Sequence, residues 1–187
     1  ILPSVCSSLS FQDSKNLVAG YLDTIVGIWD LTNGQFNPFA NVKSAQFNPS
    51  VVHCVAAYNH SSSASSSLFT DKFTAVARQT GLCVYQNGKL IIDSLLEHKG
   101  AVQAVVFAEC FDTPHTVSGA ADGSLMVFDC IKLKPLDCFN IDDEKVQCIT
   151  SNSRIIAVAD TSDNGSIGIF TPEDFLDHQN EEEEKKE

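Results

Sequence analysis

The sequence predicts an all-β fold of about four β-propeller blades, and three observations predict it. Two alternating apolar runs joined by a polar turn occur four times, with a period of about 42 residues. Further alternating runs flank these pairs, which gives each repeat room for four short strands. A Trp-Asp pair closes the third run of the first repeat. One such sheet leaves both faces uncovered, so blades of this kind must stack on neighbours.

The central pair of runs defines the repeat. It occupies the segments 16-31, 73-88, 115-130 and 154-170. Each segment has an aromatic residue near its end, at Trp29, Tyr85, Phe128 and Phe170. The intervals between these aromatics are 56, 43 and 42 residues, and a loop over the serine-rich stretch Ser61 to Ser67 accounts for the longer first interval.

A turn residue lies six positions before each aromatic, and glycines stand at or near the last three turns. The turn residues are Asp23, Gln79, Asp122 and Asn164, and the glycines are Gly81, Gly123 and Gly165. Asp-Gly and Asn-Gly between alternating runs predict tight hairpins in which both central residues have positive φ. The second and third strands of every blade are therefore predicted.

The flanking runs predict the remaining strands. First strands are expected at 4-11, 51-58, 101-108 and 145-151, and fourth strands at 34-42, 88-96 and 134-141. No such run follows the last repeat, which is therefore predicted to lack a fourth strand. We expect one partial propeller over 1-176, with blades at about 4-42, 51-96, 101-141 and 145-171, and an acidic disordered tail over 177-187.

Trp29-Asp30 and its weaker copy Phe128-Asp129 resemble the signature pair of the WD-repeat family. The resemblance implies a seven-bladed ring, of which this sequence would supply about four blades. It also implies a non-enzymatic adaptor that binds other proteins. Some family members are regarded as substrate receptors of cullin-RING ubiquitin ligases. Thr32 and Ile131 stand where the ligase-docking motif of such blades has arginine.

The resemblance further implies a structural hydrogen-bonded chain in the third repeat. His98, Ser118 and Asp122 match its first three members, with His98 expected to bond Asp122, and Phe128 replaces the final Trp. The same three residues could form a nucleophilic triad. However, no G-x-S-x-G elbow is present, and in a blade the residues lie between strands, so we predict a structural role.

The amino-acid composition argues against several classes of protein function. Twelve Lys and Arg against 24 Asp and Glu give a net charge of −12, which argues against nucleic-acid binding. No apolar run approaches the roughly 20 residues that a membrane-spanning helix needs. The seven cysteines are odd in number and form no CxxC motif, which favours a reducing compartment, the cytoplasm or nucleus.

No cofactor or metal site is predicted. His53 and Cys54 are adjacent on a strand and so point to opposite faces, and His60 has no second ligand at metal spacing. Cys83, Cys110 and Cys148 lie in apolar runs and are interpreted as small core residues. The stretch Ser61 to Ser67 is either a phosphorylation target or an inert linker.

The first functional hypothesis is a protein-interaction scaffold, with a cullin-RING substrate receptor as its most concrete version. An RNA-processing or ribosome-assembly scaffold is the alternative, weakened by the acidic balance. A propeller enzyme is less favoured, because the predicted innermost strands carry only His53 and Lys145 besides hydroxyls and thiols. Four blades leave two open edges. We therefore expect a truncated chain, or else a dimer whose halves build one eight-bladed ring.

Overall fold

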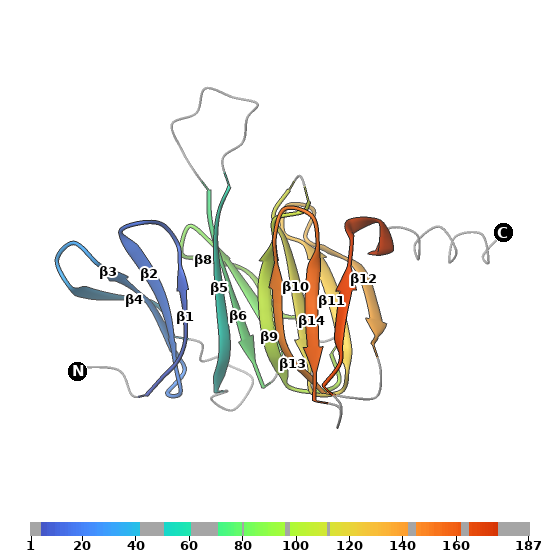
Figure 1. Cartoon of the computed structure of the whole chain (residues 1–187). Helices are drawn as coiled ribbons and strands as arrows, with labels where there is room; N and C mark the ends of the chain where they lie inside the picture. The colour runs from blue at the N-terminus through green and yellow to red at the C-terminus, as the bar shows by residue number, and fades with distance from the viewer. Residues whose placement is uncertain are drawn as a thin grey trace. The chain divides into compact units, whose positions relative to one another are not determined.

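The computed structural model describes residues 5–41, 51–60, 71–79, 81–95, 98–111, 113–141, 145–161 and 165–175. Figure 1 shows that these residues are almost entirely β-strand, with one helical turn at 172–175. The strands are β1 (Cys6–Phe11), β2 (Asn16–Tyr21), β3 (Ile25–Asp30), β4 (Gln35–Asn41), β5 (Val52–His60), β6 (Asp71–Arg78), β7 (Gly81–Gln86), β8 (Lys89–Leu95), β9 (Val102–Ala108), β10 (His115–Ala120), β11 (Ser124–Asp129), β12 (Lys134–Asn140), β13 (Val146–Ser151), β14 (Ile156–Asp160) and β15 (Ile167–Phe170).

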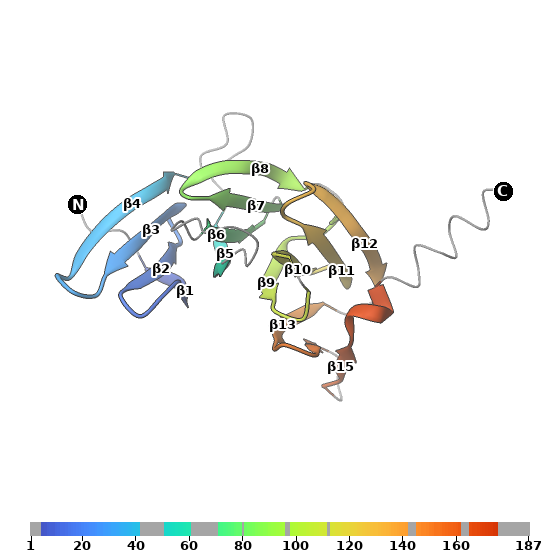
Figure 2. The same cartoon turned by 90° about the horizontal axis from the view of Figure 1, so that it is seen from above.

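The strands form four antiparallel meanders, each with its strands in chain order. Blade 1 contains β1–β4, blade 2 contains β5–β8, blade 3 contains β9–β12 and blade 4 contains β13–β15. In Figure 2 the first and last strands of blade 1 lie at opposite edges of its sheet. The predicted all-β blade fold is confirmed, and within the described residues the sheet of blade 4 has three strands.

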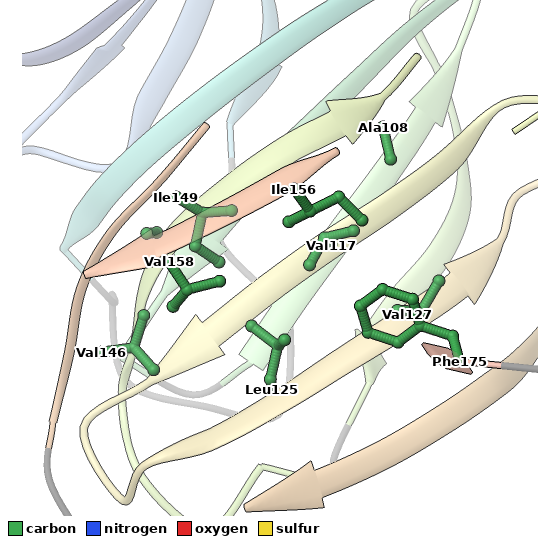
Figure 3. Packing of buried hydrophobic residues seen from close by; sticks show 10 residues of the cluster. Ala108, Val117, Leu125, Val127, Val146, Ile149, Ile156, Val158 and Phe175 are labelled. Carbon is green, nitrogen blue, oxygen red and sulfur yellow. The ribbon is translucent and has the colours of Figure 1, made fainter. Parts of the chain in front are cut away.

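The chain divides into two compact units. Unit 1, Ile1–Leu96, holds blades 1 and 2, and unit 2, Glu97–Glu187, holds blades 3 and 4. Valines dominate the core of unit 1, which Cys83 and Tyr85 complete. The core of unit 2 joins β-branched and leucine side chains of both blades to Phe175 from the helical turn (Figure 3).

A β-bulge recurs at one place in all four blades. In each pairing of first and second strand, the register shifts by one residue near the start of the first strand, at Ser7, His53, Gln103 and Gln147. The extra residue reverses the alternation of side chains. As a result, the two residues that flank the bulged residue, such as Val52 and Cys54, point to opposite faces of the sheet.

Two glycines allow neighbouring blades to approach closely. A Cβ atom on Gly119 of β10 would lie 2.3 Å from Cγ1 of Val146 in blade 4. A Cβ atom on Gly20 of β2 would lie 2.6 Å from Cγ1 of Val52 in blade 2. Both glycines pair with the residue just after the bulge. The contacts of blade 1 with blade 2 and of blade 3 with blade 4 therefore leave no room for a Cβ atom at these two glycines.

The hairpins differ from the prediction. Three residues, Ala121–Gly123, separate β10 from β11, and of these only Gly123 has positive φ. Its N–H donates to the carbonyl of Ala120 at 3.2 Å. Thr24 takes the same conformation in blade 1, with φ of 74°. The predicted pair of positive-φ residues is wrong, because the loop is one residue longer and only its last position is left-handed.

Several predictions fall outside the described residues: the Ser61 to Ser67 loop, the turn residue Asn164, and the acidic tail 177-187. The side chain of His60 is also undescribed. Among the cysteines interpreted as core residues, Cys83 is buried and Cys110 is half-buried, whereas Cys148 is exposed. The core prediction for Cys148 is wrong, because the bulge in β13 turns this residue to the face away from blade 3.

Candidate functional site

Blade 3 brings His98, Ser118 and Asp122 into one hydrogen-bonded cluster. The Nε2 atom of His98 lies 2.8 Å from the hydroxyl of Ser118 on β10. Its Nδ1 atom lies 2.6 Å from the hydroxyl of Ser124, the first residue of β11. That hydroxyl in turn donates to Oδ1 of Asp122 at 2.5 Å. The expected direct bond between His98 and Asp122 is thus replaced by a bridge through Ser124, a residue outside the predicted trio.

The cluster fixes where its protons lie. Because Ser124 donates to a carboxylate, its oxygen accepts the proton of His98 Nδ1. Burial favours the neutral imidazole, in which Nε2 accepts from the hydroxyl of Ser118. Asp122 also accepts the backbone N–H groups of Lys99 at 2.7 Å and Gly100 at 2.9 Å. The chain of bonds ties the segment before β9 to the β10–β11 turn.

The pKa shifts agree with this protonation state. Burial lowers the pKa of His98, against the opposing charge of Asp122. For Asp122, burial acts to raise the pKa, but hydrogen bonds from Ser124, Lys99 and Gly100 together outweigh it and lower the pKa. Ser118 is buried and its hydroxyl donates within the cluster. The arrangement satisfies buried polar groups and holds two segments together.

A second histidine of blade 3 is buried beside the signature aspartate. The Nδ1 atom of His115 lies 2.8 Å from the carbonyl of Thr113, and its Nε2 atom lies 3.6 Å from Asp129. The ring of Phe111 stacks on the imidazole at 4.4 Å. Burial lowers the pKa of His115, although the bond to Thr113 and the charge of Asp129 oppose this.

Both histidines make stability depend on pH. Their folded-state pKa values lie below the unfolded value, so the unfolded chain binds protons that the folded chain does not as the pH falls through about 6.5. We expect the free energy of unfolding to be lower at pH 5.5 than at pH 7.5, by at most about 1.4 kcal/mol per histidine. Urea denaturation at the two pH values measures the difference. The His98→Gln/His115→Gln variant should show a flatter profile, and an equally steep one would contradict the assignment.

The two residues of the Trp-Asp pair have different structural roles. In blade 1, the indole N–H of Trp29 donates to the hydroxyl of Tyr21 at 2.7 Å. Asp30 accepts the backbone N–H and the hydroxyl of Thr32 and so closes the β3–β4 turn, and these bonds lower its pKa. Phe128 in blade 3 is buried opposite Thr116 and cannot donate a hydrogen bond.

Asp129 repeats the role of Asp30 in blade 3. Its Oδ1 atom accepts the backbone N–H groups of Ile131 at 2.8 Å and Lys132 at 2.9 Å. Burial acts to raise the pKa of Asp129, but these bonds and the charge of His115 lower it. Both signature aspartates therefore hold the turn that leads into the fourth strand.

Blade 2 has a different polar cluster on the face toward blade 1. Arg78 is buried, and its guanidinium donates to Asp93 at 3.0 Å and to the sulfur of Cys83 at 2.5 Å. Burial raises the pKa of nearby Tyr85 to about 12, assisted by the charges of Cys83 and Asp93. The sequence does not predict this cluster, since Arg78 ends an apolar strand and Asp93 lies in another strand.

The described residues contain no group of three His, Cys, Asp or Glu side chains placed to hold a metal ion. His53 and Cys54 do not form part of such a group. In the same part of the chain, no helix has the length and apolar character required to cross a bilayer.

Comparison with solved structures identifies the fold. WD40-repeat structures are similar over most of this chain: U3-55K with a TM-score of 0.69 and 15% identity, and the RRP9 WD40 repeats with 0.70 and 16%. Each match covers 91% of this chain, and 53% and 52% of the other chain respectively. The chain therefore spans about half the length of these WD40 proteins and has the blade fold of a WD40 propeller.

Computationally designed proteins are similar too. The Ika4 protein has a TM-score of 0.65 and 20% identity, over 91% of this chain and 93% of its own. The Ika8 protein has 0.63 and 20%, over 90% of this chain and 46% of its own. No family model and no curated protein sequence matches the chain.

Proposed function

We propose that this chain is a protein-interaction scaffold that binds a partner through the β11–β12 turn of blade 3. The supporting observation is a pair of aliphatic residues that lie half exposed at this turn and do not contribute to a hydrophobic core. Ile131 is 50% exposed and Leu133 is 52% exposed at this turn. Exposed apolar side chains grouped on a well-held turn are typical of binding sites.

Backbone conformation strengthens the proposal. Leu133 precedes β12 and has φ of 55°. The residues directly before β4 and β8 are Gly34 and Gly88, with φ of 70° and 76°. A left-handed conformation costs a leucine about 1–2 kcal/mol, which glycine avoids. Because half of Leu133 remains exposed, burial offsets only part of this cost, and contact with a partner supplies a reason for a leucine at this position.

The turn is also held in one conformation before binding. Asp129 fixes Ile131 and Lys132 through their backbone N–H groups, and the ammonium of Lys132 lies 3.4 Å from the same carboxylate. A preformed turn loses less entropy when a partner binds. We infer a partner surface with an apolar pocket and carboxylates near it, which would accept the two aliphatic side chains beside Lys132.

Leu133→Gly should move stability and binding in opposite directions. We expect the free energy of unfolding to rise by about 1 kcal/mol, because the strain at φ of 55° is removed. Partner recovery in affinity purification of the tagged chain should fall several-fold. Quantitative mass spectrometry and denaturant unfolding measure the two effects. Leu22→Ser removes an exposed aliphatic side chain from the β2–β3 turn and is the control; equal loss of partners in both variants would contradict the proposal.

A finer version of the function is a substrate receptor of a cullin-RING ubiquitin ligase in the cytoplasm or nucleus. It rests on the resemblance of Cys6–Phe11, the linker 48-53, the segment 98-129 and the start of the last blade, 143-146, to the C-terminal portion of WD repeat-containing protein 53 and its relatives. Because Thr32 and Ile131 replace the docking arginine, an adaptor subunit would have to bind another surface of the chain. The same purification tests this version, since the receptor role requires ligase adaptor subunits to co-purify with the unmodified chain. A partner set without any adaptor would contradict the receptor role and leave the scaffold role standing.

A further inference from the structure

A histidine and an aspartate are buried together behind the β11–β12 turn of blade 3. His115, the first residue of β10, pairs across the sheet with Asp129, the last residue of β11. Their side chains are 7% and 1% exposed. The ring of Phe111 stacks on the imidazole with its centroid 4.4 Å away, so it covers one face of that ring. The pair is thus shielded from water, although the turn that follows it is exposed.

The hydrogen bonds of His115 determine which nitrogen carries the proton of the neutral ring. Nδ1 lies 2.8 Å from the carbonyl oxygen of Thr113, and a carbonyl oxygen can only accept, so Nδ1 is the donor. Nε2 then has a lone pair and no hydrogen. It lies 3.6 Å from Oδ2 of Asp129, which is also an acceptor. Two acceptors therefore face each other with no proton between them.

The two oxygens of Asp129 have different surroundings. Oδ1 accepts the backbone N–H groups of Ile131 and Lys132. Oδ2 is buried, and no donor among the described residues forms a hydrogen bond with it. The ammonium of Lys132 lies 3.4 Å from Oδ2, and the side chain of Lys132 is 66% exposed. Oδ2 therefore lies between a buried imidazole and an exposed ammonium.

The titratable and charged groups nearest to His115 come from the elements packed around it. They are Asp129 of β11, Lys132 of the β11–β12 turn, Glu109 and Cys110 of the segment after β9, and Glu173 of the helical turn. Burial lowers the pKa of His115, and of these groups only Asp129 and Lys132 act on it through their charge, in opposite directions. Cys110 is neutral near pH 6, because burial raises the pKa of its thiol. The strands of blade 4 add only Asp160, at the far end of that blade.

A proton on Nε2 turns the two facing acceptors into a donor and an acceptor. The imidazolium of His115 can donate to Oδ2 of Asp129, and such a charge-assisted hydrogen bond is strong in a buried site. Oδ2 then attracts the ammonium of Lys132 less, and an ion pair with an exposed partner is weak to begin with. The summed charge of the three side chains rises from zero to +1. Lys132 becomes available to a carboxylate of another molecule.

We propose that the β11–β12 turn is a proton-gated docking site, in which protonation of His115 releases Lys132 from Asp129 to a carboxylate of the partner. The proposal rests on the function proposed above and adds the regulation of that site. Oδ1 of Asp129 keeps its two backbone N–H bonds in both states, so the turn keeps its conformation while its charge changes. Binding to an acidic partner surface is therefore tighter at pH 5.5 than at pH 7.5.

The expected size of the effect follows from the ion pair that is released. An exposed pair such as that of Lys132 with Asp129 corresponds to a change in affinity of at most about five-fold. The carboxylates of the partner keep their charge at pH 5.5, since the ordinary pKa values of Asp and Glu are about 3.9 and 4.3. The pH dependence therefore comes from His115 and not from the partner surface.

An NMR titration of the isotope-labelled chain from pH 7.5 to pH 5.5 tests the gate without any partner. A lysine ammonium does not itself titrate in this range, because the ordinary pKa of lysine is about 10.4. We expect the Cε and Nζ resonances of Lys132 to shift with the same midpoint as the ring nitrogens of His115. Long-range ¹H–¹⁵N spectra at pH 7.5 should place the ring proton of His115 on Nδ1.

Three variants separate the gate from a general effect of acid. His115→Gln removes the proton site and should abolish the shift of Lys132. His98→Gln removes the other buried histidine of the blade, which bonds Ser118 and Ser124, and should leave that shift unchanged. Phe111→Ala keeps His115 but exposes its ring, so both midpoints should move together toward 6.5. This last variant tests the coupling even if His115→Gln does not fold.

Rebinding of partners at two pH values tests the docking step. Partners eluted from the tagged chain are applied again at pH 7.5 and pH 5.5 and measured by quantitative mass spectrometry. Partners that Leu133→Gly loses should rebind the unmodified chain several-fold better at pH 5.5, and His115→Gln should remove the difference. Equal rebinding of these partners at both pH values would overturn the proposal.

The failure of the gate and the failure of the docking function give different results. Lys132 resonances that do not follow the titration of His115 would overturn the gate, and the docking function would still be judged by Leu133→Gly. Equal loss of partners in Leu133→Gly and Leu22→Ser would overturn the docking function, and with it the proposed use of the gate, even where Lys132 follows His115.

Discussion

Replacing Gly119 by alanine is expected to lower the free energy of unfolding of unit 2 by about 2–3 kcal/mol. A Cβ atom there would lie 2.3 Å from Cγ1 and 2.8 Å from Cβ of Val146, and 3.1 Å from Cδ1 of Ile149. Two of these atoms are close to the backbone of β13 and cannot move away alone. Blade 4 must shift as a whole, and overpacking of this kind costs about 1–3 kcal/mol. Urea denaturation of the variant and the unmodified chain measures the difference.

A double-mutant cycle identifies the cause. Val146→Ala removes the two methyl groups of Val146 and should destabilise unit 2 by leaving a cavity. In combination with Gly119→Ala, however, it makes room for the new methyl group. The double variant should therefore be more stable than the sum of the single effects predicts, by about 1 kcal/mol or more. Additive effects would show that Gly119 does not act through its contact with Val146.

Asp122→Ala is expected to cost about 3 kcal/mol of stability. The carboxylate accepts four hydrogen bonds, from the N–H groups of Lys99, Gly100 and Ser124 and from the Ser124 hydroxyl. Bonds to charged groups contribute about 1.5–3 kcal/mol each, and water can replace part of them at this turn. Loss of the carboxylate also frees Ser124 to rotate away from His98, which leaves a buried imidazole nitrogen poorly satisfied.

The loss of stability on substituting Asp122 should depend on how many acceptor oxygens and how much negative charge the new residue keeps. Asp122→Asn keeps one acceptor oxygen and should lose about half as much stability as Asp122→Ala. Because the pKa of Asp122 is lowered in the folded state, its contribution is present above the unfolded pKa and is lost as the pH falls through the folded value. Glu109→Ala removes an exposed acid from the same blade and is the control. Equal stability of Asp122→Ala and Glu109→Ala would contradict the role of the cluster.

Strand placement could be predicted from the sequence because side-chain alternation and turn residues are local signals. The aromatics used to align the repeats, such as Trp29 and Phe128, all lie on third strands, as the register required. The bulges were not predicted, because the alternation of apolar residues was assumed to be unbroken along each first strand, although the bulged residues, such as Ser7 and Gln103, are all polar. The bulge decides which residues face which neighbour, so the exposure of Cys148 was also missed.

The polar cluster of blade 3 could be predicted only in part. His98, Ser118 and Asp122 were found through the family resemblance, whereas Ser124 was overlooked. The spacing of Asp122 and Ser124, two residues apart across a turn, could have indicated the bond between their side chains. The cluster of Arg78 and Asp93 depends on which strands pair, and nothing in the local sequence indicates it.

Contact between successive blades, a small residue against a branched one, is tested most directly by nuclear Overhauser effects in methyl-labelled chain. The account predicts strong cross-peaks from the Hα protons of Gly119 to the methyl groups of Val146, and from those of Gly20 to Val52. Absence of both cross-peaks, with β13 and β5 giving effects to other strands instead, would contradict it.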